Sequence, residues 1–265
     1  MKFLTTVLTS GSMALLNKAL RSIPRNNDVH IICNTLDEQY RAELTSSDLG
    51  WSYPIVHTES DGLAGKGQQS CLDHFLTQTD YTHLIRLDGD DQFFEGGHQQ
   101  IMDTAAANPT VNVLSLLGEV LCTSAGTTNW SKVDLRVWVE AQGYELTVDI
   151  AAWLFEMSGY TGDSDYWFER MVCVDKVGAA AERYNSLQCN TEDVQMMMKM
   201  NLRSLKDEIV YRQFESSTCY RYNKVNGFGA SDSKWNDPKG WREEMVAPFT
   251  DKELEIITAT RIPKV

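Results

Sequence analysis

The sequence predicts one α/β domain whose strands form a largely parallel sheet. Short apolar segments rich in β-forming residues, at 2–9, 28–33 and 53–57, alternate with segments of helical character. A strand that returns to the same sheet through a helix runs parallel to the strand before it. With 265 residues, 42% of them hydrophobic, the chain is long enough for one large domain with a full core.

The remaining predicted elements continue the alternation of strands and helices. Ser10-Gly11-Ser12 ends the first strand and can cap a helix that runs to about residue 23, and a polar helix extends to about residue 44. Further helices are expected at 68–77 and 95–107, and further strands at 81–87, 111–117 and 171–177. The apolar segments 133–139 and 147–157 fit strand and helix alike, so their type stays open.

Three carboxylates follow the buried strand at 81–87 within four residues, namely Asp88, Asp90 and Asp91. An apolar strand that is followed directly by acidic residues places negative charge at the edge of the sheet. At about 5 Å and an effective dielectric near 20, each like-charged pair costs roughly 3 kcal/mol. A divalent cation relieves this repulsion, and hard carboxylate oxygens suit Mg²⁺ or Mn²⁺. The alternative is an acidic turn in which Asp88 caps the helix near Glu95.

Ligands of parallel α/β sheets bind at the carboxyl ends of the strands. In this chain Thr9 and Ser10 stand at the end of the first strand, and Asn34 stands at the end of the second. With the loop 57–67 they are expected to line one crevice together with the aspartates. The glycines around Lys66 would let backbone N–H groups approach an anion at a helix start, and a flexible surface turn is the alternative.

A second pair of acids, Glu192 and Asp193, follows Thr191, which is a good N-cap residue. The helix dipole favours acids in a first turn, which is a sufficient structural reason for both. Methionines that follow in the same helix indicate a face that packs in the core. They are Met196, Met197, Met198 and Met200.

The C-terminal part combines aromatic, basic and glycine residues at 220–224 and 227–235. This composition is typical of a mobile lid over a phosphate ligand. The alternative is a tail whose aromatic side chains pack back on the domain.

The formal net charge of −13 argues against nucleic-acid binding through the overall field of the protein. Residues 201–265 nevertheless hold 11 of the 24 basic side chains, which leaves room for a local phosphate-binding groove. The six cysteines are widely spread, without the spacing of a zinc site, as is typical of core residues in a reducing compartment. We recognise neither a signal peptide nor the ~20 apolar residues of a membrane span, so we expect a cytoplasmic protein.

The order of these motifs resembles that of the GT-A fold glycosyltransferases, particularly the family 2-like inverting enzymes. The match consists of Leu87-Asp88-Gly89-Asp90-Asp91 and, about a hundred residues later, Glu192-Asp193, and it covers roughly residues 1–200. The resemblance implies a Rossmann-like mixed sheet flanked by helices, in a single domain with a C-terminal extension. It divides the chain into a nucleotide-sugar-binding half at 1–117, an acceptor-binding and catalytic half at 118–225, and a lid or tail at 226–265.

The resemblance also implies an activity, the metal-dependent transfer of a sugar from a nucleotide-sugar, expected to be a UDP-sugar, to an acceptor hydroxyl. Asp90 and Asp88 would bind Mn²⁺ or Mg²⁺, and Asp193, with Glu192 as the second choice, would be the general base. The nucleotide-sugar would be bound by Thr9, Ser10, Asn34, Lys66, Arg86, Asp88 and Lys234.

Three features depart from the family pattern. No histidine follows His98, so the C-terminal metal-binding histidine of many GT-A enzymes is missing. Gly178-Ala179-Ala180 stands where a Gly-Gly-aromatic sequence is usual, which affects the expected acceptor site. The segment from Gly229 to Trp235 is similar to the diphosphate clamp of retaining GT-A enzymes. We expect an inverting enzyme, and the retaining mechanism stays open.

Two other functions suit a sheet of this kind. A sugar-nucleotide nucleotidyltransferase normally carries a Gly-rich, Arg-containing signature after the first strand, and residues 9–13 do not provide one. A non-catalytic nucleotide- or glycan-binding protein is the other alternative. The acceptor is open among glycans, lipid head groups, proteins and a hydroxymethylated DNA base, as in viral DNA glycosylation.

Overall fold

A computed structural model of the chain describes the arrangement of most of these elements. It covers residues 1–49, 52–117, 120–123, 126–129, 145, 147–148, 169–185, 192–216, 218–223 and 238–265. Three segments for which the sequence left alternatives lie outside the described residues, namely 133–139, most of 147–157, and 227–235.

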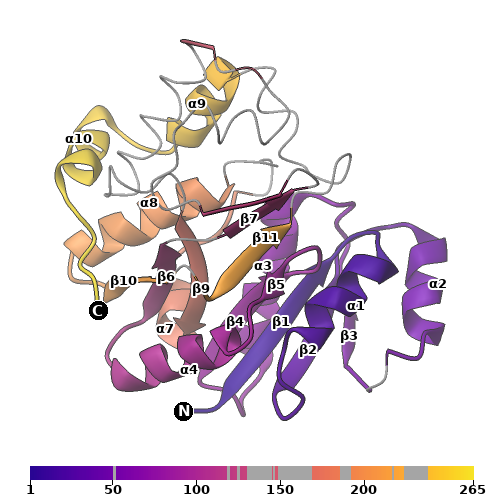
Figure 1. Ribbon diagram of the computed structural model, residues 1–265. Coiled ribbons are helices and arrows are strands. Elements are labelled where there is room, and N and C mark those ends of the chain that lie inside the picture. Colours follow the sequence, from indigo (N-terminus) through magenta and orange to yellow (C-terminus); the bar gives the residue numbers. More distant parts are fainter. Residues whose placement is uncertain are drawn as a thin grey trace.

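The centre of the molecule is a mixed seven-stranded sheet (Figure 1). Its strands are β1 (Phe3–Thr9), β2 (Asp28–Cys33), β3 (Ile55–His57), β4 (His83–Asp88), β6 (Val113–Leu117), β9 (Glu169–Asp175) and β10 (Tyr211–Glu215). They lie in the order β10-β6-β9-β4-β1-β2-β3. β9 runs antiparallel to both β4 and β6, and the other four neighbouring pairs are parallel. The expected α/β class and the mixed sheet are therefore confirmed.

Two layers of helices cover the sheet, and the alternation of side chains along the strands explains the division. One layer comprises α1 (Met13–Arg21), α2 (Glu38–Ser46) and α4 (Gly97–Ala107), and the other comprises α3 (Ala64–Thr77), α7 (Lys176–Ala181) and α8 (Glu192–Leu205). In β4, Ile85 and Leu87 pack with the first layer, whereas Leu84 packs with the second. Each such aliphatic side chain contributes roughly 1.5–3 kcal/mol when it is fully buried.

The expected core residues are confirmed where they are described. Met196, Met197, Met198 and Met200 of α8 are each at most 2% exposed. The described cysteine side chains are free thiols buried in the core, namely Cys33, Cys71, Cys173 and Cys219.

A smaller four-stranded sheet lies beside the carboxyl end of β4. It comprises β5 (Gln92–Phe93), β7 (Val120–Thr123), β8 (Gly126–Asn129) and β11 (Tyr220–Asn223), in the order β5-β11-β7-β8. β11 pairs antiparallel with β5, directly after the three aspartates. Residues 220–223, expected in a lid or a packed tail, thus form a strand, and Tyr220 is fully buried.

The last described segment packs against α8 and the sheet edge. It comprises α9 (Pro238–Val246) and α10 (Asp251–Ala259), and both helices contact α8. Gln195 of α8 donates from Nε2 to the backbone oxygens of Glu244 and Met245. The backbone of Val265 bonds to Gln213 in β10, so the chain ends against the edge strand.

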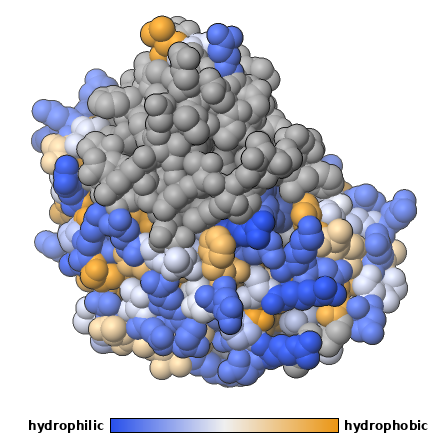
Figure 2. All heavy atoms as spheres, viewed as in Figure 1, coloured by the Kyte–Doolittle hydropathy of each residue, from blue (hydrophilic) through white to orange (hydrophobic). Residues whose placement is uncertain are grey.

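The described surface in one view is mostly hydrophilic, with hydrophobic residues scattered over it (Figure 2). Within the described residues, no helix combines the length and the apolar character that crossing a bilayer requires.

Candidate functional site

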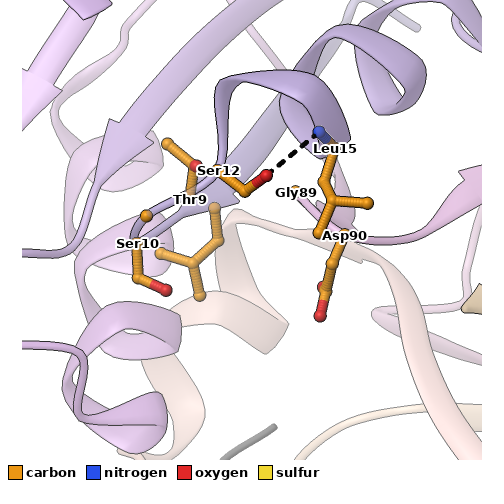
Figure 3. A pocket seen from close by; sticks show the side chains of 8 residues that line it. Thr9, Ser10, Ser12, Leu15, Gly89 and Asp90 are labelled. Carbon is orange, nitrogen blue, oxygen red and sulfur yellow. Dashed lines mark hydrogen bonds between the residues drawn. The ribbon is translucent and has the colours of Figure 1, made fainter. Parts of the chain in front are cut away.

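The carboxyl ends of β1 and β4 border a small pocket of about 70 Å³. Its walls come from the end of β1, the first turn of α1 and the turn after β4 (Figure 3). The lining residues are Leu8, Thr9, Ser10, Gly11, Ser12, Leu15, Gly89 and Asp90. Ser12 caps α1 by accepting the backbone N–H of Leu15 at 3.4 Å. The crevice expected at the strand ends is thus present in part, where β1 and β4 meet. Asn34 and the loop 57–67, which were also expected to line it, are not among the residues that border this pocket.

Gly89 fixes the turn that separates the three aspartates. A Cβ at this position would lie 2.7 Å from the backbone oxygen of Leu8, closer than side chains tolerate. The Gly89 N–H donates to that same oxygen at 2.6 Å. Because the turn is held against β1, Asp88 remains on the face of β4 that points to α3, while Asp90 lines the pocket.

Asp91 points into the protein and is fully buried. Its Oδ2 accepts the Tyr220 hydroxyl at 2.9 Å, and its Oδ1 accepts the backbone N–H of Asn223, also at 2.9 Å. The Arg170 guanidinium lies 3.7 Å away. Burial and then the charge of Asp90 raise the pKa of Asp91 well above its ordinary value. The third acid of the motif therefore ties the turn to β11.

Asp88 is held by two partners from other elements. Gln68 of α3 donates to its Oδ1 at 2.9 Å, and Arg170 of β9 pairs with its Oδ2 at 2.5 Å. Burial works to raise the pKa of Asp88, but Arg170 and Arg86 outweigh it and hold the pKa below the usual range. The alternative role of Asp88 as a helix cap is wrong, because α4 begins after Gly96.

A buried chain of hydrogen bonds connects this cluster to the acids of α8. Arg86 alternates with Leu84 and Asp88 along β4 and so faces α3. Its guanidinium donates to the Gln68 Oε1 and to the Tyr184 hydroxyl. Tyr184 in turn donates to Asp193 Oδ1 at 3.3 Å, and Arg86 lies 3.7 Å from the same oxygen. Gln68 and Arg86 therefore link Asp88 to Asp193.

Glu192 and Asp193 occupy the first turn of α8, as expected, but their surroundings differ. Asp193 leaves 28% of its side chain exposed beside Arg86. Glu192 is 8% exposed, and its Oε2 has no hydrogen-bond partner among the described residues. Burial and then the charge of Asp193 raise the pKa of Glu192 to about 8. A carboxyl with this pKa is mostly protonated at neutral pH.

Asp90 has the properties of a metal ligand. Among the described residues no other side chain donates a hydrogen bond to its carboxylate, and Asp90 is one of the side chains that line the pocket (Figure 3). Burial and then the charge of Asp88 raise its pKa to about 6, so a nearby cation would relieve an unfavourable charge. No group of three His, Cys, Asp or Glu in the described part of the chain is placed to hold an ion. The donor set fits an ion of the Mg²⁺ type, which one or two carboxylates bind together with substrate phosphates.

Two of the expected nucleotide-binding residues have side-chain partners within the protein. Thr9 is buried and its hydroxyl bonds to Tyr40 at 2.5 Å. Asn34 donates to the backbone of Leu63 and accepts from Thr58, both at 3.1 Å, and so shapes the loop before α3. Their contribution to nucleotide binding stays a prediction.

The other expected binding residues are in different settings. Ser10 is exposed at the pocket, and Lys66 is exposed in the first turn of α3. The sequence suggested a helix that begins only after the glycines, whereas α3 begins at Ala64 and includes them. At Gly67 a Cβ would lie 2.5 Å from the Asn34 amide, so this glycine permits close packing. Lys234 lies outside the described residues.

Four side chains of this site were not singled out by sequence reasoning. Gln68 and Tyr184 bind Arg86, and Arg170 and Tyr220 bind the aspartates. Strand alternation offered one signal, since it places Arg86 and Asp88 on the same face and thus calls for polar partners there. Nothing local indicated Arg170, because its contact depends on the antiparallel insertion of β9 between β4 and β6.

Comparison with known proteins identifies the fold. No protein-family model and no curated protein matches the sequence. The structure of S. aureus TarS 1–349, a GT-A type glycosyltransferase, matches with a TM-score of 0.56 and 14% identity, over 98% of this chain and 70% of that chain. The same fragment in complex with UDP-GlcNAc matches with a TM-score of 0.56 and 15% identity, over 98% and 71%. At this identity the likeness establishes the architecture, and the chain therefore has the GT-A fold.

Proposed function

We propose that this protein is a glycosyltransferase that moves a sugar from a UDP-sugar to an acceptor hydroxyl. The observation that carries the proposal is the link between two acids, one in the turn after β4 and the other at the start of α8. Asp90 lines a pocket at the ends of β1 and β4, and Asp193 stands at the start of α8, joined to the same turn through Arg86, Gln68 and Asp88. TarS, which shares the fold, has been solved with UDP-GlcNAc and with UDP.

The donor would bind with its diphosphate near Asp90. A bound Mg²⁺ or Mn²⁺, held by Asp90 and, if its pair with Arg170 opens, by Asp88, would supply positive charge to the leaving diphosphate. Asp88 is already paired with Arg170, so Asp90 is the main candidate ligand. Ser10 is exposed at the same pocket and would contact the nucleotide.

Asp193 is the better candidate for the general base. Glu192 is mostly protonated at pH 7 because its pKa is raised to about 8, whereas Asp193 is partly exposed and oriented by Tyr184. In an inverting transfer, the acceptor oxygen forms a bond to the anomeric carbon as the bond from that carbon to the diphosphate oxygen breaks. The acceptor proton passes to the Asp193 carboxylate, and UDP leaves with the bonding electron pair.

The class of acceptor remains a prediction. Several of the C-terminal cations that suggested a phosphate groove pair with carboxylates on the surface: Arg203 with Glu182 and Glu208, Lys206 with Glu253, and Lys264 with Glu215. These pairs reduce the positive field that a DNA backbone would meet. A modified DNA base is therefore a less favoured acceptor than a glycan or another small hydroxyl compound.

The proposal is tested with UDP-sugars and Mn²⁺, by following UDP release and product mass. The variant Asp193→Asn removes the base while keeping the shape of the side chain. We expect it to lower turnover by about 10²- to 10⁴-fold and to leave UDP affinity, measured by calorimetry, unchanged. Asp103→Asn is the matched control, because Asp103 is an exposed helical acid whose side chain, among the described residues, accepts from Gln99 alone.

Three outcomes would contradict the proposal. Full turnover in the Asp193→Asn variant would place the base elsewhere. Pyrophosphate release from a nucleoside triphosphate would indicate a nucleotidyltransferase. Binding of UDP-sugars without any product in the wild type would indicate a non-catalytic binding protein.

A further inference from the structure

Arg170 is the cation at the centre of the acidic cluster. It reaches from β9 to pair with Asp88 at 2.5 Å and with Asp91 at 3.7 Å. Its guanidinium carbon lies 4.7 Å from the ring centre of Tyr220 and 5.9 Å from that of Tyr222. The side chain is only 13% exposed. Two ion pairs and two aromatic rings fix it more firmly than a surface arginine.

The oxygens of two aspartates are therefore already in use. Asp88 accepts from Gln68 and Arg170, one partner for each oxygen. Asp91 accepts from Tyr220 and from the backbone of Asn223, again with one partner for each oxygen. Within the described part of the chain, Asp90 is the member of the cluster whose carboxylate has no donor from another side chain.

We propose that Arg170 is a positioning residue that withholds Asp88 from divalent cations, so that the metal binds only together with a nucleoside diphosphate. This inference rests on the donor site of the proposed function. It adds to that function the order in which the nucleotide and the metal bind, and it names Arg170 as the residue that imposes this order.

The argument is one of ligand number and charge. An ion of the Mg²⁺ type needs six oxygens, and a single carboxylate with water holds it weakly. A diphosphate brings further anionic oxygens, which complete the shell beside Asp90. Without Arg170, Asp88 would regain an oxygen with nothing to neutralise it. Asp88 and Asp90 would then form a pair of carboxylates that attracts a metal unaided.

Mn²⁺ binding followed by electron paramagnetic resonance of the free ion tests this without any turnover. In the wild type we expect UDP to increase the Mn²⁺ affinity at least tenfold. Arg170→Met, which keeps the apolar stem, should raise the affinity for Mn²⁺ alone about tenfold or more. Asp90→Asn in the Arg170→Met background should reverse most of that gain. Arg170→Lys keeps the positive charge but loses the two-pronged guanidinium, so its Mn²⁺ affinity should lie between those of the wild type and Arg170→Met.

The matched control is Arg183→Met. Arg183 also pairs with an aspartate, Asp73, but on the surface, with 67% of its side chain exposed. The Arg183→Met variant removes the same charge from the protein as Arg170→Met does. An equal gain in Mn²⁺ affinity in both variants would show a general effect of net charge and would overturn the proposal.

Two further outcomes would overturn it. One is a wild type that binds Mn²⁺ as tightly without UDP as with it, and this comparison decides the matter even if Arg170→Met does not fold. The other is a folded Arg170→Met variant whose Mn²⁺ affinity is unchanged. If UDP binds but Mn²⁺ does not require it, only this inference fails. If UDP binds neither with nor without Mn²⁺, the proposed function fails as well.

Discussion

Asp90 and Asp91 are neighbours in the sequence but have opposite environments. Asp91 is fully buried and bonded to Tyr220 and Asn223, whereas Asp90 lines the pocket beside Ser10. The difference arises because Gly89 binds the turn to β1 on one side and β11 pairs with β5 on the other. Within this acidic motif, the Asp91 carboxylate thus stabilises the turn, and the neighbouring Asp90 carboxylate faces the pocket.

The largest expected effect is on activity at Asp90. We expect Asp90→Ala to reduce turnover of the UDP-sugar by about 10³-fold, because the charge on the leaving diphosphate would lose its main neutralising ion. The free energy of unfolding should not fall, because burial and the charge of Asp88 make the ionised Asp90 carboxylate unfavourable in the folded state. Steady-state kinetics and urea denaturation measure the two quantities. Unchanged turnover would remove Asp90 from the metal site.

The complementary variant, Asp91→Ala, is expected to act on stability. It leaves the Tyr220 hydroxyl and the Asn223 N–H without their acceptor in a buried site, which we expect to lower the free energy of unfolding by about 3 kcal/mol. Urea denaturation of this variant beside Asp90→Ala makes the comparison direct. Equal stability of the two variants would contradict the division of roles.

Glu192 provides a smaller test based on pH. Burial and then the charge of Asp193 raise its pKa from 4.5 in the reference state to about 8 in the folded protein. The folded state therefore binds a proton that the unfolded state has lost, and stability should fall as the pH rises from about 4.5 to about 8. Glu192→Gln should flatten this decline in denaturation curves recorded across that range without metal. An unaltered slope would mean that Glu192 ionises normally.

The smallest effect is expected at Lys66. Its side chain is exposed in the first turn of α3, so Lys66→Ala should change the affinity for UDP by no more than about twofold. Calorimetry measures this directly. A tenfold loss would support the prediction from the sequence that this residue binds the donor phosphates.

The sequence was informative where structure is local. The parallel strands, the start of α8 and its buried methionines follow from hydrophobic patterns and capping residues. The environment of the aspartates did not follow, because it depends on distant residues: Arg170 lies 82 positions from Asp88, and Tyr220 lies 129 positions from Asp91. The start of α3 was also misplaced, since glycine usually weakens a helix, whereas Gly67 is required for the close approach of Asn34.

The most direct test of the central claim is a crystal structure with UDP and Mn²⁺, using the anomalous signal of the metal. We predict one Mn²⁺ bonded to the Asp90 carboxylate and to the diphosphate, with Arg170 still paired with Asp88 and Asp91 still bonded to Tyr220. A metal bonded to Asp91, or UDP bound with Asp90 turned away from it, would contradict this account.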